Sequence, residues 1–194
     1  MPIILDGTKG ETFPSWTTGT RPATPNTGQT GYNTTLGGLE TYNGSAWVTP
    51  SFGPAFAAYG SAFTSVSNGT YTKLAYNTKS SPGFDTNTNY DTTNYRFTPT
   101  VAGYYQLSAT SSVAAAAAGS AWVMFYKNGS VAAYGPYQPL TSSSNLYFSF
   151  TVLLYANGST DYFELYAYQS SGGALNMGSN SAQILFSAGL VRAG

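Results

Sequence analysis

The sequence contains neither cysteine nor histidine among its 194 residues. Without cysteine there can be no disulfide, no zinc–thiolate site and no cysteine nucleophile. Without histidine, a serine triad that uses imidazole as its base is excluded. The fold must therefore be held by its hydrophobic core, by association with other copies of the chain, or by both.

Charge is also scarce. Charged residues make up 7% of the chain, against roughly a quarter in typical soluble domains. Seven basic and seven acidic residues balance to a net charge of zero, so the electrostatic footprint of a nucleic-acid-binding protein is absent. A cationic membrane-binding face is equally unsupported. The sequence predicts no nucleic-acid partner and no membrane insertion, with a surface covered by neutral polar groups.

Long apolar runs are missing too. The start "MPIILDGTKG" has an apolar run of three residues and no cationic leader, which predicts no secretory signal. No run of about 18 apolar residues occurs, so no transmembrane helix is expected.

Residues 1–53 are rich in glycine, threonine and proline. Pro14, Pro22 and Pro25 exclude a regular helix and favour an extended arm with short strands. Within it, "GGLETYNGSAWVTP" (37–50) predicts a hairpin, because Asn-Gly readily adopts the positive φ angles of a two-residue turn. Two short strands are not stable alone in water. We therefore interpret residues 1–53 as an attachment arm and a connector to something larger.

From Phe52 onward the sequence changes to short apolar bursts of strand length, separated by turns. Asn68-Gly69, Asn128-Gly129 and Asn157-Gly158 each lie between such bursts and repeat the hairpin signal. The only helix candidate is the alanine run 114–118, which is too short to be stable alone and is interpreted as small residues packed in or beside a strand. The predicted class is all-β.

Three bursts are informative in detail. Alternation in "GYYQLSATSSV" (103–113) predicts a half-buried strand, and "AWVMFYKNG" (121–129) is apolar enough for burial on both faces or for a subunit contact. Residues 147–171 are predicted to form one long hairpin turning at Asn157-Gly158. The residues predicted to share faces are Tyr105, Leu107 and Ala109; Tyr162, Glu164, Tyr166 and Tyr168; and Phe163, Leu165 and Ala167.

The order of these pieces resembles the complement globular-head domain, the jelly roll shared with the tumour necrosis factor superfamily. The motifs that carry the resemblance are "PAFAAYG" (54–60), "FTPTVAGYYQLSA" (97–109), "FYKNGSVAA" (125–133), "VLLYANGSTDYFELYAY" (152–168) and "ILFSAGLV" (184–191). The resemblance implies a homotrimer of ten-stranded jelly-roll β-sandwiches over residues 54–194. An aromatic content of 16% suits a domain that buries part of its surface between subunits.

Residues 20–48 resemble a segment common in bacteriophage tail-fibre and head-fibre proteins. The resemblance implies a non-enzymatic structural component of a virion, located on the particle surface. It would be a head fibre, tail fibre, spike or capsid decoration protein, whose arm binds a capsid, neck or tail protein. Its head would either bind a host-surface glycan or stabilise and shield the capsid.

Two groups of residues are candidates for these contacts. Apolar side chains on a Gly/Pro-rich segment suit burial by a partner, with ordering on binding; the candidates for virion attachment are Ile3, Ile4, Leu5, Phe13 and Trp16. Tyrosine supplies rigid apolar area with a hydroxyl group. Tyr134 and Tyr137, in the Gly/Pro stretch "AAYGPYQP", are the candidates for surface recognition.

Catalytic and metal sites are not predicted. "FDTNTNYD" (84–91) spaces oxygen side chains like a calcium loop, but Tyr90 replaces the required glycine and Arg96 stands where the loop needs Glu. An Asx-rich turn is the better interpretation. Asp161 and Glu164 lie three residues apart and would point to opposite faces of a strand, whereas a glycosidase needs two converging carboxyls. We predict no enzyme activity, no metal and no cofactor.

The sequence allows two rival functions. One is a secreted binding module of the complement-head type, which the start of the sequence argues against. The other is a polysaccharide depolymerase, which the scarcity of acids and the absence of histidine disfavour.

Overall fold

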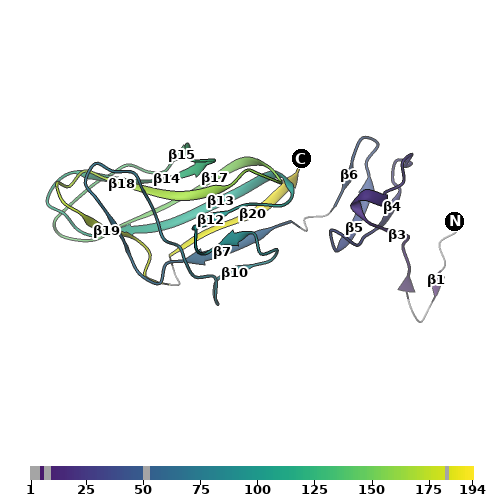
Figure 1. The fold of residues 1–194 in the computed structure, drawn as a ribbon, viewed down its shortest axis with the longest axis horizontal. Helices are drawn as coiled ribbons and strands as arrows, with labels where there is room; N and C mark the ends of the chain where they lie inside the picture. Colours follow the sequence, from purple (N-terminus) through teal and green to yellow (C-terminus); the bar gives the residue numbers. More distant parts are fainter. Residues whose placement is uncertain (1–4, 7–9, 50–52, 182–183) are drawn as a thin grey trace. The chain divides into compact units, whose positions relative to one another are not determined.

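The computed structural model describes residues 5–6, 10–49, 53–181 and 184–194. The chain divides into two compact units, Met1–Phe52 and Gly53–Arg192, which we call the small unit and the head (Figure 1). The described residues are almost entirely strands and turns, so the predicted all-β class is confirmed. Their one helical segment is the 3-10 turn η1 (Thr18–Thr20), and no described helix is long and apolar enough to cross a membrane.

The small unit contains a four-stranded sheet in the order β3, β4, β5, β6. These strands are β3 (Ser15–Trp16), β4 (Thr30–Asn33), β5 (Gly38–Tyr42) and β6 (Trp47–Val48). The pair β3–β4 is parallel and the other two pairs are antiparallel. Before the sheet, β1 (Leu5–Asp6) pairs with β2 (Gly10–Glu11). The prediction of an extended arm is therefore wrong for residues 15–48, which fold back on themselves.

The predicted hairpin around Asn43-Gly44 is present between β5 and β6. Its loop has four residues, Asn43 to Ala46, rather than two. The Asn43 side-chain oxygen accepts hydrogen bonds from the backbone N–H groups of Ser45 (3.0 Å) and Ala46 (2.9 Å), and Gly44 has a φ of 102°. The asparagine thus closes the turn with its side chain, as Asx turns do.

A buried carboxylate, not a large apolar core, organises the small unit. Glu40 is 0% exposed and accepts hydrogen bonds from Trp16 Nε1, from Asn33 Nδ2 (3.0 Å) and from both Nε (2.9 Å) and Nη2 (2.6 Å) of Arg21. Burial acts to raise the pKa of Glu40, but these hydrogen bonds outweigh it and hold the pKa below its usual value. The network joins β3, β4 and β5 to the segment after η1 in one interaction.

The ring of Trp16 completes this interior. It meets Trp47 edge-on at 4.9 Å between centroids and lies directly over Gly31 in β4. A Cβ atom added at Gly31 would lie 2.1 Å from the Trp16 ring, so any side chain there would displace the indole. Glycine is required at this position by close approach rather than by a turn.

The head consists of two seven-stranded sheets. The first contains β7 (Ala55–Tyr59), β8 (Thr64–Val66), β10 (Phe84–Asp85), β13 (Ala102–Val113), β17 (Leu146–Asn157), β19 (Leu175–Gly178) and β20 (Leu185–Ala193). The second contains β9 (Thr72–Lys73), β11 (Tyr90–Asp91), β12 (Arg96–Phe97), β14 (Ser120–Lys127), β15 (Ser130–Tyr134), β16 (Gln138–Pro139) and β18 (Phe163–Gln169). The structure describes fourteen strands in the head rather than the predicted ten, and five of the fourteen are two-residue segments.

Early and late strands alternate within each sheet. β7 pairs with β20, β20 lies beside β13, and β13 pairs with β17 along its whole length. In the second sheet, β18 lies between β12 and β14, and β14 pairs with β15. Two sheets connected in this alternating way form a double Greek-key jelly roll.

The Asn-Gly turns do not all make hairpins. Asn128-Gly129 does, with both residues at positive φ and Lys127 paired with Ser130. The predicted long hairpin at Asn157-Gly158 is wrong, because β17 pairs with β13 in the first sheet and β18 pairs with β14 in the second. The segment after Asn68-Gly69 also crosses between the sheets. The alanine run 114–118 forms a loop between β13 and β14, not a helix.

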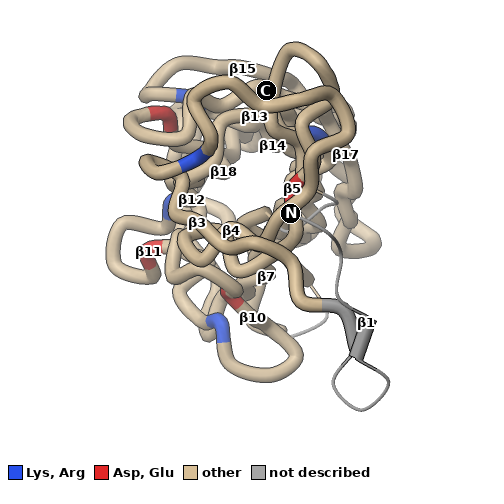
Figure 2. Tube along the Cα trace, turned by 90° about the vertical axis from the view of Figure 1, so that its right-hand side faces the viewer, with Lys and Arg blue, Asp and Glu red and all other residues tan. Residues whose placement is uncertain are grey.

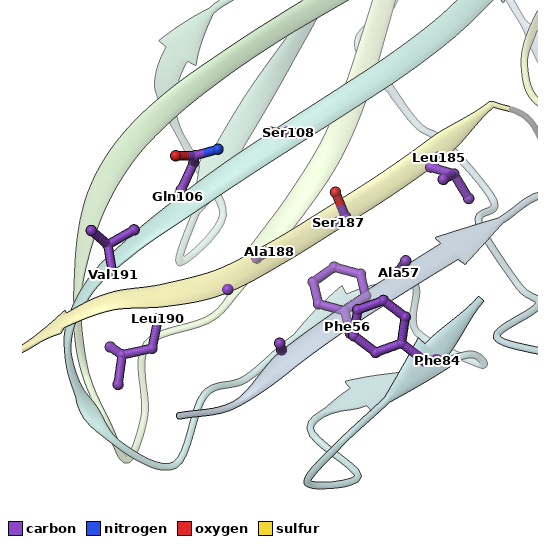
Figure 3. Close-up of a pocket in the computed structure, with 12 residues that line it drawn as sticks. Phe56, Ala57, Phe84, Gln106, Ser108, Leu185, Ser187, Ala188, Leu190 and Val191 are labelled. Carbon is purple, nitrogen blue, oxygen red and sulfur yellow. The ribbon is translucent and has the colours of Figure 1, made fainter. Parts of the chain in front are cut away.

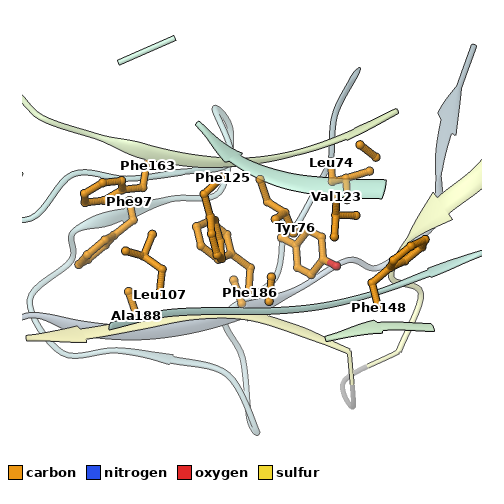
Figure 4. Packing of buried hydrophobic residues seen from close by; sticks show 14 of the residues in the cluster. Leu74, Tyr76, Phe97, Leu107, Val123, Phe125, Phe148, Phe163, Phe186 and Ala188 are labelled. Carbon is orange, nitrogen blue, oxygen red and sulfur yellow. The ribbon is translucent and has the colours of Figure 1, made fainter. Parts of the chain in front are cut away.

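The inner faces of the two sheets bury one apolar layer between them (Figure 4). As predicted, Tyr105, Leu107 and Ala109 of β13 are buried. Aromatic rings dominate this layer. Phe186 of β20 lies 4.9 Å from Phe56 and 5.7 Å from Phe125 between centroids, so its ring contacts residues of both sheets.

We expect Phe97→Ala to destabilise the head by about 3 to 5 kcal/mol, the usual effect of truncating a buried ring. Phe97 is 0% exposed and lies 4.6 Å from Phe56 and 5.6 Å from Tyr105 between ring centroids. Urea unfolding of the purified protein measures the difference. Tyr71→Ala, at a ring 45% exposed, is the control and should cost about 1 kcal/mol or less. Equal effects of the two variants would contradict this account of the core.

We expect the small unit to lose stability in acid through Glu40. Because the folded-state pKa of Glu40 lies below 4.5, its stabilisation is complete above that pH and is lost as the pH falls toward the lower, folded-state value. Glu40→Gln should cost about 2 kcal/mol at neutral pH and remove much of this acid sensitivity. Tryptophan fluorescence during urea unfolding, in a Trp122→Phe background, reports on Trp16 and Trp47. An unchanged pH dependence in Glu40→Gln would refute the assignment.

Candidate functional site

The predicted attachment residues lie in different surroundings. Ile3 and Ile4 lie outside the described residues. Leu5 lies in β1, opposite Glu11 of β2, and Phe13 is partly buried. Trp16 was expected to be covered by a partner, but it is 8% exposed and lies in the interior of its own unit. Trp16 is therefore corrected from an attachment residue to a structural one.

The predicted recognition residues Tyr134 and Tyr137 are both 65% exposed. Tyr134 is the last residue of β15, and Tyr137 lies in the loop between β15 and β16. Their surroundings differ, since Tyr137 is stacked on Trp122 at 5.7 Å between centroids. Their role in recognition stays a prediction.

The outer face of the first sheet, over β7, β20, β13 and β17, is nearly free of charge. No Asp, Glu, Lys or Arg occurs in β7, β13 or β17, and β20 contains only Arg192. Large apolar or aromatic side chains are exposed there instead. We call this surface the neutral face; its large exposed residues are Tyr104, Tyr147, Leu153, Tyr155 and Val191, and exposed Phe84 of the adjacent strand β10 borders it.

A groove of about 510 Å³ lies in the neutral face (Figure 3). Phe84 of β10 and Val191 of β20 are among its lining residues, and Gln106 and Ser108 of β13 are the polar ones from that strand. Nothing in the lining is ionisable at neutral pH. The groove suits an apolar side chain and offers no chemistry for catalysis.

The outer face of the second sheet has a different chemistry. Tyr162, Glu164, Tyr166 and Tyr168 lie on this side of the sheet, as the alternation predicts, because Phe163, Leu165 and Ala167 are buried on the other. Aromatic rings from neighbouring strands pack against those of β18. We call the surface they form the aromatic face; it comprises Tyr71, Trp122, Tyr126, Tyr137, Tyr166 and Tyr168.

The rings of the aromatic face contact one another directly. Trp122 of β14 stacks on Tyr168 at 4.2 Å, and Tyr168 lies 4.9 Å from Tyr71. Tyr126 stacks on Tyr166 at 3.9 Å, and burial raises the pKa of both phenols. Tyr126 and Tyr166 are therefore uncharged at physiological pH.

The charges of the second sheet are paired with one another. Glu164, 2% exposed, accepts from Lys73 Nζ at 2.9 Å and from Arg96 Nη2 at 2.8 Å. The Arg96 guanidinium also lies over the ring of Tyr162, 4.0 Å from its centroid. Figure 2 shows charged positions beside β10, β11, β12 and β18. The ionic groups thus support the sheet rather than form an open charged patch.

The carboxylates considered for catalysis or metal binding are engaged inside the fold. Asp85 binds Lys79 Nζ at 2.7 Å and the backbone N–H groups of Asn89 and Tyr90. Burial opposes ionisation of Asp85, but these partners hold its pKa below the usual value. The loop is the Asx-rich turn predicted from its sequence. Asp161 is ion-paired with Lys127 and Glu164 with Lys73 and Arg96, so the two belong to separate clusters.

Sequence reasoning missed three members of the aromatic face, Trp122, Tyr126 and Tyr71. Trp122 lies in residues 121–129, which were interpreted as buried on both faces or as a subunit contact. Because nearly every residue of this run is apolar, the alternation between inward and outward positions was not visible. A signal was present, since Val123 and Phe125 are buried inward and Trp122 and Tyr126 have the opposite parity. Tyr71 could not be placed because its position depends on β9 crossing to the second sheet.

Comparisons with known proteins bear on the fold alone. No protein-family model and no curated protein matches the chain. Solved structures that are similar to it include the globular domain of the zebrafish complement 1qA protein (15% identity, 73% of this chain and 99% of that one, TM-score 0.47). The tumour necrosis factor protein Eiger from S. frugiperda is similar at 10% identity over 73% of this chain and 94% of that one, with a TM-score of 0.47. Murine APRIL is similar at 10% identity, 66% of this chain and 98% of that one, with a TM-score of 0.41. The jelly-roll assignment rests on the strand order given above.

Proposed function

We propose that the chain is a non-enzymatic structural component of a bacteriophage virion, with a small unit that attaches to the particle and a trimeric head that projects from it. The observation that carries the proposal is the neutral face. A large sheet surface with exposed Leu153, Tyr155 and Val191 and almost no charge is suited to burial against other copies of the chain. A closed ring of three heads buries one such face on each subunit.

The virion location is supported by the resemblance of residues 20–48 to phage fibre segments and by the separation of a small unit from the head. In this proposal Ile3, Ile4, Leu5 and Phe13 bind a capsid, neck or tail protein. A fibre, a spike and a capsid decoration protein all fit this arrangement. The secreted binding module remains the second reading of the same fold, and the particle experiment below separates the two.

We expect the full chain to be a trimer with three times the 20.4 kDa chain mass in light scattering coupled to size exclusion. Leu153→Arg places a charge at a position 53% exposed in the centre of β17 and should yield monomers. Tyr71→Arg, on the other sheet, is the control and should stay trimeric. A monodisperse wild-type monomer at micromolar concentration would contradict the proposed trimer. A Leu153→Arg protein that is still trimeric would show that the subunit interface does not lie on the neutral face.

Deleting residues 1–50 should leave a folded, trimeric head that no longer incorporates into particles. The reason is that the head is a compact unit by itself, whereas the proposed attachment residues all lie in the deleted part. Quantitative mass spectrometry of purified virions, made with the full-length or the truncated gene, measures the copy number. Normal occupancy of the truncated head would place attachment in the jelly roll. Absence of the full-length chain from particles would favour the secreted module.

A further inference from the structure

Four rings of the aromatic face form a continuous row across the second sheet. In order they are Tyr137, Trp122, Tyr168 and Tyr71, with successive centroids 5.7, 4.2 and 4.9 Å apart. They come from the β15–β16 loop, β14, β18 and the residue before β9. The two end residues, Tyr137 and Tyr71, are 65% and 45% exposed. The row is therefore exposed at both ends, whereas its two inner rings are stacked between their neighbours and partly buried.

The second observation is an unsatisfied donor in the middle of this row. Trp122 Nε1 is the one buried side-chain nitrogen or oxygen, in the described part of the chain, that has no hydrogen-bond partner. Such groups are rare in folded proteins because leaving them unpaired is costly. Tyr137 stacks on Trp122 from a loop that contains Gly135 and Pro136.

The third observation is charge. The row consists of tyrosine and tryptophan side chains, without Asp, Glu, Lys or Arg, and the nearby Glu164 is ion-paired with Lys73 and Arg96. A polyanion such as a nucleic acid would need unpaired cations along its path. The row offers none of these. Charge complementarity therefore favours an uncharged ligand.

From these observations we infer that the aromatic face binds an extended neutral polysaccharide, lying along the row of rings. A neutral sugar has a C–H face that stacks on an aromatic ring and a rim of hydroxyl and ether oxygens that accept hydrogen bonds. The row supplies the exposed rings and hydroxyl groups of Tyr137 and Tyr71 at its two ends and the unpaired indole N–H of Trp122 between them. A row exposed at both ends fits the interior of a long chain better than a terminal sugar. This inference deepens the adhesive part of the proposed function and rests on it.

The occupant is not a second copy of the head in this proposal, because self-association is assigned to the neutral face. The two surfaces belong to opposite sheets, so both can be occupied at once. A trimer would present three rows, and binding to a repeating polymer would gain from the effective concentration of the second and third sites.

The test uses the purified full chain in native gels containing soluble polysaccharides. Hydroxyethylcellulose, galactomannan and dextran are the neutral probes, and alginate is the charged one. We expect retardation by at least one neutral polymer and none by alginate. Trp122 is the only tryptophan of the head, so binding should also change the fluorescence of a Trp16→Phe, Trp47→Phe protein in which it is the remaining tryptophan.

Two variants and a control locate the site. Tyr137→Ala removes a mostly exposed ring and should weaken binding about tenfold. Trp122→Phe keeps a ring but removes the N–H donor, and should weaken binding several-fold. Tyr32→Ala changes a tyrosine of the small unit that is 42% exposed and should bind as the wild type does. Thermal melts of all three confirm that the head is folded.

The outcomes are decisive in each direction. Failure of all three neutral polymers to retard the wild-type protein, or retardation by alginate alone, would overturn the inference. Unchanged binding by Tyr137→Ala and Trp122→Phe would overturn the location. Light scattering and virion incorporation are measured separately, so a trimeric particle protein that binds no polysaccharide would leave the proposed structural function intact while refuting the adhesive site.

Discussion

The head depends on one layer of aromatic rings buried between its two sheets. Phe186 lies at its centre, in contact with Phe56 of its own sheet and with Phe125 of the opposite one. Because the chain has no disulfide, this layer has to hold the sheets together with only a few ion pairs at their edges. Burial of a ring stabilises the fold in proportion to the apolar area that it removes from water. Large rings therefore give the most stabilisation for each inward-facing strand residue. Both sheets are therefore built with bulky inward positions.

That constraint leaves the two outer faces free to differ. With the inner positions committed to the core, the alternate positions of each strand carry whatever chemistry the surface requires. In β13 and β17 they are Tyr, Gln, Ser, Thr and Leu, and in β18 they are Tyr and a glutamate held by two cations. One sheet thus presents an uncharged surface with a groove, and the other an aromatic surface with paired charges beside it. This difference is the basis on which we propose self-association through the first surface and infer ligand binding at the second.

Local patterns predicted the parts of the fold that local chemistry decides. The alternation in residues 103–113 and 162–168 reports a periodicity of two that the sheet imposes directly, and it placed Tyr105, Leu107 and Glu164 on the correct sides. Asn128-Gly129 was predicted as a tight turn because both residues tolerate positive φ. At Asn157-Gly158 the same signal misled. A turn pair shows that the chain reverses, but whether the next strand joins the same sheet depends on partners such as β14, which lie far away in the sequence.

The fold of the small unit was even harder to predict from local sequence patterns. Its apolar content is too low for a conventional core, and from composition alone an extended arm was the reasonable expectation. The structure replaces the missing core with a charge-assisted network, in which Glu40 receives hydrogen bonds from Trp16, Asn33 and Arg21, residues 24, 7 and 19 positions away. The four residues lie in three different strands and the segment after η1, so no pattern within a single element connects them. The sequence signal lies in Gly31, whose missing side chain makes room for the indole that reaches Glu40, and that role is visible only once the two strands are brought together.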